Sequence, residues 1–247
     1  MDLSSFALLI AAGLIGGACN AVAGGGTFFT FPALLAVGVP PIVANATSAI
    51  SIWPGHATSL LGYRKELARH ADRLKSSAPA FVIGAVIGAA LLAVTGNGVF
   101  RQLIPWLLLV ATLLFAIGPT LRTWISTNRS GTLPKPVIFL IDLVVAIYGG
   151  YFGAGLGILL MAVLTLIGLS DVNEANAVKN ALATIVSTLA VAVFIATGII
   201  AWGPGAAVLA GAIVGGYLGA RFARWINPKI LRGIIIAVGL GLTWFYF

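Results

Sequence analysis

Charged residues are scarce in this chain. Of its 247 residues, 14 are lysine or arginine and 6 are aspartate or glutamate, which is 8% in total, whereas 60% are hydrophobic. A soluble domain carries about a quarter charged residues, so this chain cannot surround itself with a polar surface. The composition excludes an ordinary soluble globular protein and predicts an all-α polytopic membrane protein with the lipid bilayer as its solvent.

Residues for redox, metal and hydrolytic chemistry are equally rare. Cys19 is the only cysteine, so an intramolecular disulfide is excluded. The two histidines and Cys19 do not form a recognisable metal site or nucleophile constellation. There is no Walker A sequence, which argues against ATP hydrolysis. We therefore expect no enzyme activity, no cofactor and no metal.

The apolar segments predict about eight full transmembrane helices plus two short segments. Residues 27–38 and 156–169 fall short of the ~20 residues that a crossing helix needs, so they are either short tilted spans or broken, re-entrant arms. The full spans are residues 5–23, 42–63, 78–95, 102–118, 137–153, 175–200, 205–221 and 230–247.

One pattern occurs twice, about 130 residues apart. The first copy is Asn20-Ala-Val-Ala-Gly-Gly-Gly-Thr27, an apolar stretch and Ala44-Asn-Ala-Thr-Ser48. The second copy is Gly149-Gly-Tyr-Phe-Gly-Ala-Gly-Leu-Gly157, an apolar stretch and Ala175-Asn-Ala-Val-Lys-Asn180. Paired interruptions at matching positions of an apolar chain indicate a transport site at the interface of two repeats.

Basic residues predict the orientation of the two repeats. They cluster in three loops, which the positive-inside rule makes cytoplasmic, and this accounts for the net charge of +8 without nucleic acid. The basic loop follows the Ala-Asn-Ala helix in the first half but comes one loop later in the second, after the uncharged residues 201–204. The clusters are Arg64, Lys65, Arg69, Arg73 and Lys75; Arg122, Arg129 and Lys135; and Arg221, Arg224, Lys229 and Arg232.

This shift predicts two inverted-topology repeats. We expect a first repeat over residues 1–118, a cytoplasmic linker over 119–136 and a second, inverted repeat over 137–247. Both termini then lie outside the cell. Inverted repeats of this kind are typical of secondary transporters.

The glycine runs are the first candidates for a substrate site. Consecutive or alternating glycines break a helix and leave backbone N–H groups without partners, and two helix N-termini that converge would bind an anion. The alternative is close helix packing, as we expect for Gly211, Gly215, Gly216 and Gly219. The candidates for this backbone cradle are Gly24, Gly25, Gly26 and Thr27 with Gly153, Gly155 and Gly157.

Polar side chains near the breaks are the second candidates. Asn45, Thr47, Ser48, Asn176 and Asn180 fall in the first turns of their helices and would contact substrate, unless they serve as N-caps or bond between helices. Lys179 would bind the anion or join an ion pair; the alternative is that it snorkels to the interface.

Two titratable residues are weaker candidates for proton coupling. His56 lies in the middle of the first Ala-Asn-Ala helix, where it would carry protons or pack. Asp142 would relay protons, pair with Lys179 or mark the membrane boundary.

At these residues the chain resembles the TauE/SafE family, whose members are described as sulfite or organosulfonate exporters. The resemblance rests on Asn20–Gly26 with Phe31–Leu35 after it, and on Gly153–Gly157 followed by Ala175–Asn180. It implies a prokaryotic inner-membrane transporter of small sulfur-containing anions, driven by an ion gradient. The family often carries a Thr-Asn-Lys string in the first half, where this chain has Thr47-Ser48-Ala49, so Lys179 has no symmetric partner.

The expected function is thus alternating-access transport of a small anion, such as sulfite or an organosulfonate, with H+ as the coupling ion. A passive anion channel and a non-transporting membrane partner protein remain as alternatives. A homo-oligomer is also compatible with the sequence.

Overall fold

The computed structural model describes residues 2–22, 25–128, 133–169, 171–222 and 228–247. Within these residues the chain forms helices and no strands, which confirms the all-α prediction. The helices in chain order are α1 (Leu3–Val22), α2 (Thr27–Ala36), α3 (Pro41–Ser59), the 3-10 helix η1 (Leu60–Tyr63), α4 (Arg64–Arg69), α5 (Ala71–Val94), α6 (Asn97–Asn128), α7 (Lys135–Tyr151), α8 (Leu156–Leu166), α9 (Val172–Ala196), α10 (Trp202–Phe222) and α11 (Pro228–Tyr246).

Among the described residues, four helices are long and apolar enough to cross a membrane, and shorter apolar helices accompany them. These elements fit a multi-pass membrane protein, while the number of eight full spans stays a prediction. The four long segments are Leu3–Ala21, Ala71–Val94, Asn97–Ile125 and Asn173–Ala196; the shorter apolar helices are Thr27–Ala36, Leu156–Leu166 and Ile230–Tyr246.

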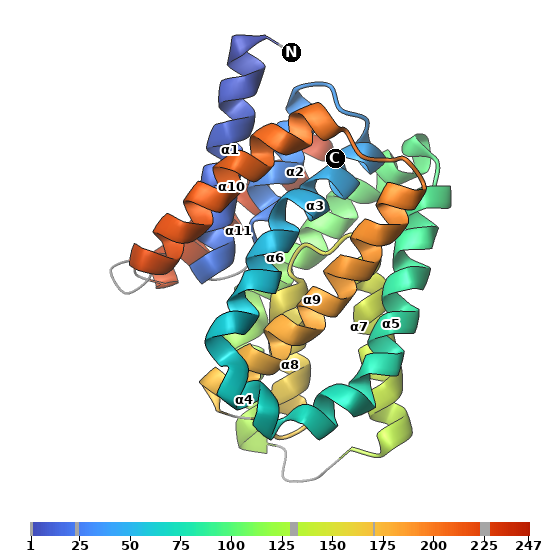
Figure 1. Cartoon of the computed structure of the whole chain (residues 1–247), viewed down its shortest axis with the longest axis vertical. Coiled ribbons are helices and arrows are strands. Elements are labelled where there is room, and N and C mark those ends of the chain that lie inside the picture. The colour runs from blue at the N-terminus through green and yellow to red at the C-terminus, as the bar shows by residue number, and fades with distance from the viewer. Residues whose placement is uncertain (1, 23–24, 129–132, 170, 223–227) are drawn as a thin grey trace.

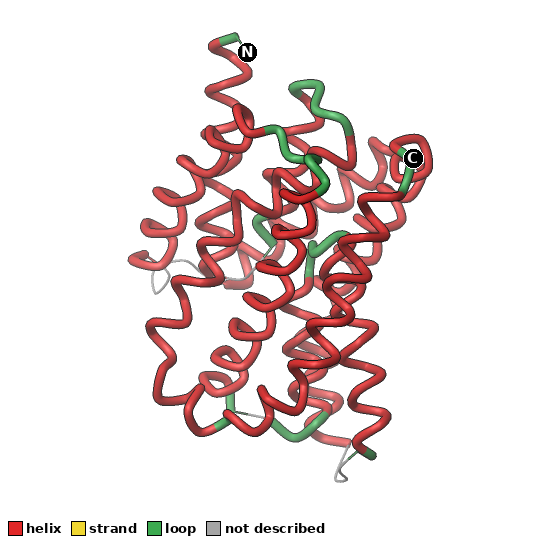
Figure 2. Tube along the Cα trace, turned by 45° about the vertical axis from the view of Figure 1, so that its right-hand side comes forward, coloured by secondary structure: helices red, strands yellow, loops and turns green. Residues whose placement is uncertain are grey.

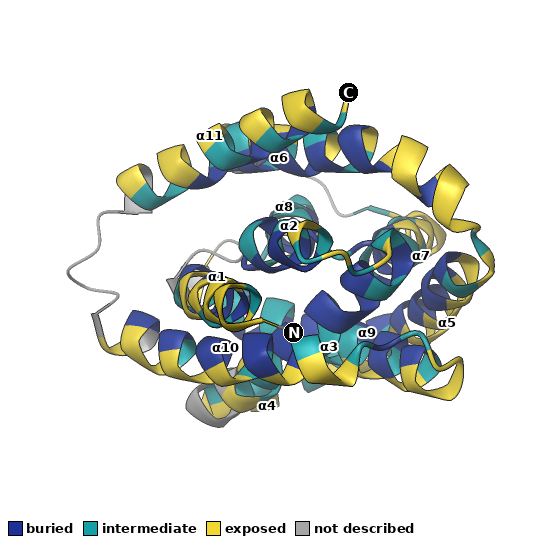
Figure 3. Cartoon of the chain, turned by 90° about the horizontal axis from the view of Figure 1, so that it is seen from above, coloured by how far each residue is buried: buried dark blue, intermediate teal, exposed yellow. Residues whose placement is uncertain are grey.

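The helices lie in three layers when the molecule is seen from above (Figure 3). Helices α6 and α11 form one outer layer, and α10, α3, α9 and α5 form the other. Helices α1, α2, α8 and α7 lie between them. The middle layer therefore contains both glycine-broken segments of the chain.

Both predicted helix breaks are present. Helix α1 ends at Val22 and α2 begins at Thr27, while α7 ends at Tyr151 and α8 begins at Leu156. Gly155, the N-cap of α8, has a φ of 75°, a backbone conformation that side chains with a Cβ rarely adopt. The short arms α2 and α8 have 10 and 11 residues, so each spans only about 15 Å and cannot cross a bilayer.

The two broken segments form hairpins that open toward opposite ends of the molecule. In Figure 1 the N-terminus and the loop after α2 lie at the top, whereas α4 and the start of α7 lie at the bottom. The C-terminus also lies toward the top, and Figure 2 shows the loops gathered at the two ends in the same way. The tips of both hairpins therefore come to the middle of the molecule.

Two close helix pairs join the first half of the chain to the second: α1 packs along α10, and α5 packs along α7. A Cβ atom at Gly215 would collide with the backbone of Leu14, and one at Gly88 with that of Ile147. The prediction of close packing is confirmed for Gly211, Gly215 and Gly219, which all lie against the backbone of α1. Gly216 differs, because it lines the central cavity described below.

Several helices continue into charged segments, beyond the ends that we predicted from the apolar stretches of the sequence. Most of the basic segment 64–75 is helical, because α4 is followed directly by the first turns of α5. Arg232 lies inside α11 rather than in a loop, and α6 continues ten residues past the predicted end at residue 118. Apolar windows end where charged residues begin, but the backbone hydrogen bonds of a helix do not depend on side-chain polarity.

Candidate functional site

A cavity of about 630 Å³ lies between the two hairpin tips and the helices α3, α9 and α10. It brings together most of the residues predicted for the substrate site, although they come from both halves of the chain. Those that line it are Gly25, Thr27, Asn45, Gly153, Gly155, Gly157, Asn176, Lys179 and Asn180. His56, which was predicted for proton coupling, lines the cavity as well. Gly24 lies outside the described residues.

Thr47 and Ser48 do not line this cavity. The Thr47 hydroxyl accepts a hydrogen bond from the backbone N–H of Ala201 at 2.9 Å. The Ser48 hydroxyl bonds to that of Thr30 in α2 at 2.6 Å, and both residues are fully buried. These two side chains tether helices, so we withdraw them from the candidate substrate site. Gly26 is withdrawn as well, because it packs against the backbone of Gly16.

Asp142 pairs with Arg73 and not with Lys179. The Arg73 guanidinium lies 3.0 Å from one Asp142 carboxylate oxygen and 3.2 Å from the other. Asp142 is only 1% exposed and is not among the residues that line the cavity. The carboxylate therefore joins α5 to α7, and its prediction as a proton-coupling residue is withdrawn.

Lys179 points into the cavity without an acidic partner among the described residues. Its Nζ donates to the side-chain oxygen of Asn176 at 3.0 Å. The two acids that precede it are engaged elsewhere: Asp171 caps α9, and Glu174 contacts His70 at 2.9 Å. These two carboxylates are therefore not available to draw the Lys179 ammonium group toward the membrane interface, and the group faces the cavity instead.

The N-terminus of α8 faces the same cavity. Within the described chain, the backbone N–H groups of Gly155 and Gly157 donate no hydrogen bond to a backbone carbonyl. Gly157 lies next to the stem of Lys179, whose Cδ would be at an ordinary contact distance of 3.8 Å from an added Cβ. Free N–H groups, the positive end of a helix and an ammonium group together favour an anion.

Side chains from both halves stabilise the α7–α8 break. The amide nitrogen of Asn45 in α3 donates to the carbonyl oxygen of Tyr151, the last residue of α7, at 3.0 Å. The Tyr148 hydroxyl donates to the Ala154 carbonyl oxygen at 2.5 Å. Two backbone carbonyls of the break thus have partners, which a low-dielectric surrounding requires.

His56 also lines the cavity, and its ring is within electrostatic reach of Lys179. Asn20 lines it as well, with its side-chain nitrogen 3.6 Å from an added Cβ at Gly55, next to His56. Asn20 and Ser187 were not predicted as site residues. The signal for Asn20 was its place at the start of the first repeated pattern, whereas Ser187 lies on the same face of α9 as Asn176 and Asn180.

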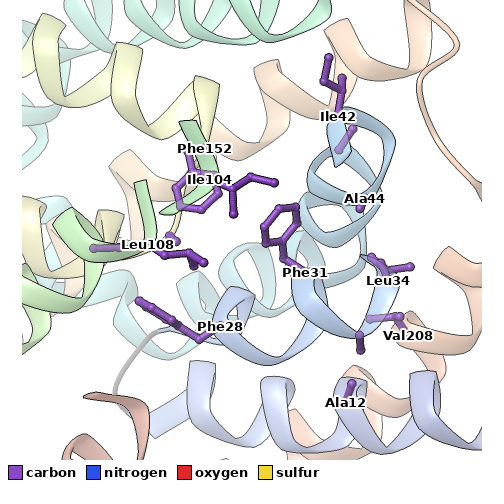
Figure 4. Packing of buried hydrophobic residues seen from close by; sticks show 14 of the residues in the cluster. Ala12, Phe28, Phe31, Leu34, Ile42, Ala44, Ile104, Leu108, Phe152 and Val208 are labelled. Carbon is purple, nitrogen blue, oxygen red and sulfur yellow. The ribbon is translucent and has the colours of Figure 1, made fainter. Parts of the chain in front are cut away.

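Aromatic side chains pack around the α7–α8 break, and one of them, Phe152, lines the cavity. The rings of Phe31 in α2 and Phe152, in the break after α7, point toward one another with centroids 5.8 Å apart (Figure 4). Phe100 at the start of α6 contacts both. Two tyrosines that line the cavity lie toward the C-terminal ends of their helices. Tyr63 is the last residue of η1, and Tyr217, in α10, is 63% exposed.

Comparisons with known proteins fit this arrangement. The sequence profile of the family described as "Sulfite exporter TauE/SafE" matches residues 9–245. The chain is 29% identical over 243 residues to "Probable membrane transporter protein ORF9" of Sinorhizobium sp, covering 96% of this chain and 90% of that protein. It is 28% identical over 262 residues to a "Probable membrane transporter protein" of Haemophilus influenzae, covering 100% and 99%.

A third relative is "Probable membrane transporter protein YfcA" of Escherichia coli K12, with 29% identity over 229 residues, 91% of this chain and 83% of that protein. No solved structure matches the chain. Because the family profile extends over nearly the whole sequence, the chain belongs to the sulfite exporter TauE/SafE family.

Proposed function

We propose that this protein is a secondary transporter of a small anion. The observation that carries the proposal is Lys179, whose ammonium group faces a central cavity with no acidic partner among the described residues. A cation without a counter-ion in an apolar helical segment is costly in a membrane protein, and such residues are kept where function requires them. An anionic substrate would supply the missing charge while it is bound at the N-terminus of α8.

The two halves act, in this proposal, as inverted repeats. Their short arms end in the same way: Gly38 after α2 and Gly168 after α8 both have positive φ angles, and the next residue in each case donates back to a leucine carbonyl. The close helix pairs also correspond between the halves. The first helix of each half, α1 or α7, packs on a later helix of the other half, α10 or α5. These correspondences support a duplicated unit over residues 1–118 and 137–247.

For the mechanism we infer alternating access, with the aromatic contact as the closure on the outer side of the cavity. The aromatic contact of Phe31, Phe100 and Phe152 lies on the side that leads to the N- and C-termini, and we assign that side to the outside of the cell. The opposite side carries Lys65 and the other exposed basic residues of α4, and we assign it to the cytoplasm by the positive-inside rule. The cavity is then closed outward.

The substrate that we favour is sulfite or an organosulfonate, because the family is described as sulfite exporters. We infer transport driven by H+, with His56, which lines the same cavity as Lys179, as the residue that exchanges the proton. The protein would act in a prokaryotic inner membrane, with no catalytic step of its own.

Counterflow in proteoliposomes tests this function. Vesicles loaded with unlabelled sulfite should accumulate labelled sulfite against its gradient, and Lys179→Ala should abolish the accumulation. Lys65→Ala, in exposed α4, is the control and should transport normally. Flux that neither saturates nor shows counterflow would instead identify a passive anion channel.

Cysteine labelling tests the inverted topology. Cys19→Ala provides a background without cysteine, since Cys19 is the only one. Cysteines placed at the exposed positions Gly203 and Lys65 should then react with a membrane-impermeant reagent from opposite sides. Reaction of both from one side would reject the orientation.

A further inference from the structure

The side-chain oxygen of Asn45 is a buried acceptor without a partner. Asn45 lines the cavity and is only 2% exposed. Its orientation is fixed, because the amide nitrogen donates to the Tyr151 carbonyl, which can only accept. Within the described residues the amide oxygen finds no donor. Buried polar atoms are almost always paired, so an unpaired one in a cavity indicates a missing ligand atom.

The second half of the chain shows what the missing partner is. Asn176 occupies the place in the second pattern that Asn45 occupies in the first, and its oxygen accepts from Lys179, three residues further on. The residue three positions after Asn45 is Ser48, whose hydroxyl is bonded to Thr30. The first half therefore has the acceptor but lacks the donor that the second half supplies.

We propose that the substrate itself supplies this donor. The transported species is then a small anion that also carries an O–H or N–H group, such as a hydroxysulfonate, an aminosulfonate or hydrogensulfite. Its charge lies at Lys179 and the N-terminus of α8, and its donor hydrogen bonds to the Asn45 oxygen. This inference rests on the proposed anion transport and narrows its substrate class.

A matched pair of ligands tests the proposal. Ethanesulfonate and 2-hydroxyethanesulfonate differ by one hydroxyl group and carry the same charge. Their dissociation constants would be measured by calorimetry on the purified full-length protein, on Asn45→Leu and on Asn45→Ser. We expect the hydroxyl group to tighten binding to the unmodified protein by roughly threefold to tenfold, the effect of one neutral hydrogen bond. Both variants should bind the two ligands equally.

The possible results separate this inference from the proposed function. Equal affinity for the two ligands in the unmodified protein overturns the inference, and the anion site stands if Lys179→Ala abolishes the binding of both. Absence of binding for both ligands and for sulfite overturns the proposed function as well. A hydroxyl preference that survives in either Asn45 variant shows that the ligand's hydroxyl donates to an acceptor other than Asn45, which overturns the inference.

Two controls cover the remaining cases. If Asn45→Leu does not fold, Asn45→Ser is measured alone, and if neither folds, the ligand comparison on the unmodified protein decides. The second control compares thermal unfolding in sodium chloride and in choline chloride, without any organic anion. If sodium stabilises the protein and this effect is lost in Asn45→Ser, the Asn45 side-chain oxygen binds a cation and the inference is overturned.

Discussion

Arg73 and Asp142 form an ion pair between α5 and α7, in which one guanidinium nitrogen donates to both carboxylate oxygens at 3.0 and 3.2 Å, although 69 residues separate them in the sequence. Asp142 is buried, and the Arg73 side chain is 19% exposed. Arg73 lies in the first turn of α5, directly after α4.

Removing one partner of this pair should be far worse than removing both. Asp142→Leu leaves a buried guanidinium uncompensated, which costs about 3–5 kcal/mol of unfolding free energy. The double variant Arg73→Met with Asp142→Leu should recover most of that loss. Thermal unfolding in detergent compares the three proteins, and a double variant as unstable as the single one would contradict the prediction.

Gly155 and Gly157 should respond differently to alanine. Gly155 has a positive φ, so Gly155→Ala strains the backbone by about 1–2 kcal/mol and displaces the N-terminus of α8. At Gly157 the nearest atom to an added Cβ is the Lys179 Cδ at 3.8 Å, an ordinary contact. We expect sulfite binding to weaken in Gly155→Ala and to persist in Gly157→Ala, as measured by ligand-induced thermal stabilisation. Equal losses would show that the helix start is not the determinant.

Ser48→Ala should affect stability without affecting binding. It removes the hydroxyl contact between α3 and α2, worth about 0.5–1.5 kcal/mol, and leaves the Thr30 hydroxyl its bond to the Gly26 carbonyl. Lys179→Ala should have the opposite effect and weaken sulfite binding rather than stability. We expect the affinity for sulfite to fall roughly tenfold to a hundredfold, as for the loss of a charged hydrogen bond. A loss of sulfite affinity in Ser48→Ala would return Ser48 to the site.

Arg232→Met should destabilise the contact between α11 and α6. The Arg232 guanidinium donates to the carbonyl oxygens of Phe115, at 2.8 Å, and Ala116. The Phe115 carbonyl needs this donor because Pro119, four residues on, has no N–H. We expect a loss of about 1–3 kcal/mol on unfolding. In a Pro119→Ala background, where the helix supplies its own donor, the same substitution should cost less.

Much of this architecture could be predicted because it depends on local chemistry. Glycine pairs inside α1, α7 and α10 remain helical, but the longer glycine-rich runs before α2 and α8 coincide with the predicted breaks, which were confirmed within a few residues. The central placement of Lys179 also followed from sequence, since few charged residues enter apolar segments.

The face on which each side chain lies could not be predicted from a short string alone. Successive helical residues are turned by about 100°, so Thr47 points almost opposite to Asn45, two residues earlier. The cavity face of α3 instead follows a helical period, with Asn45, Ala49, Ile52 and His56. Which helix packs against that face is a long-range property, and so is the pairing of Asp142 with Arg73.

The glycine contacts of α1 with α10 and of α5 with α7 have a consequence for motion. Backbone lies directly on backbone at Gly215 and Gly88, so neither surface has a layer of side chains that can slide or change rotamer. Each of these helix pairs should therefore move as one rigid body. Since each pair combines a helix from residues 1–118 with one from residues 137–247, the rigid bodies of the proposed transport cycle cannot coincide with the two halves of the sequence.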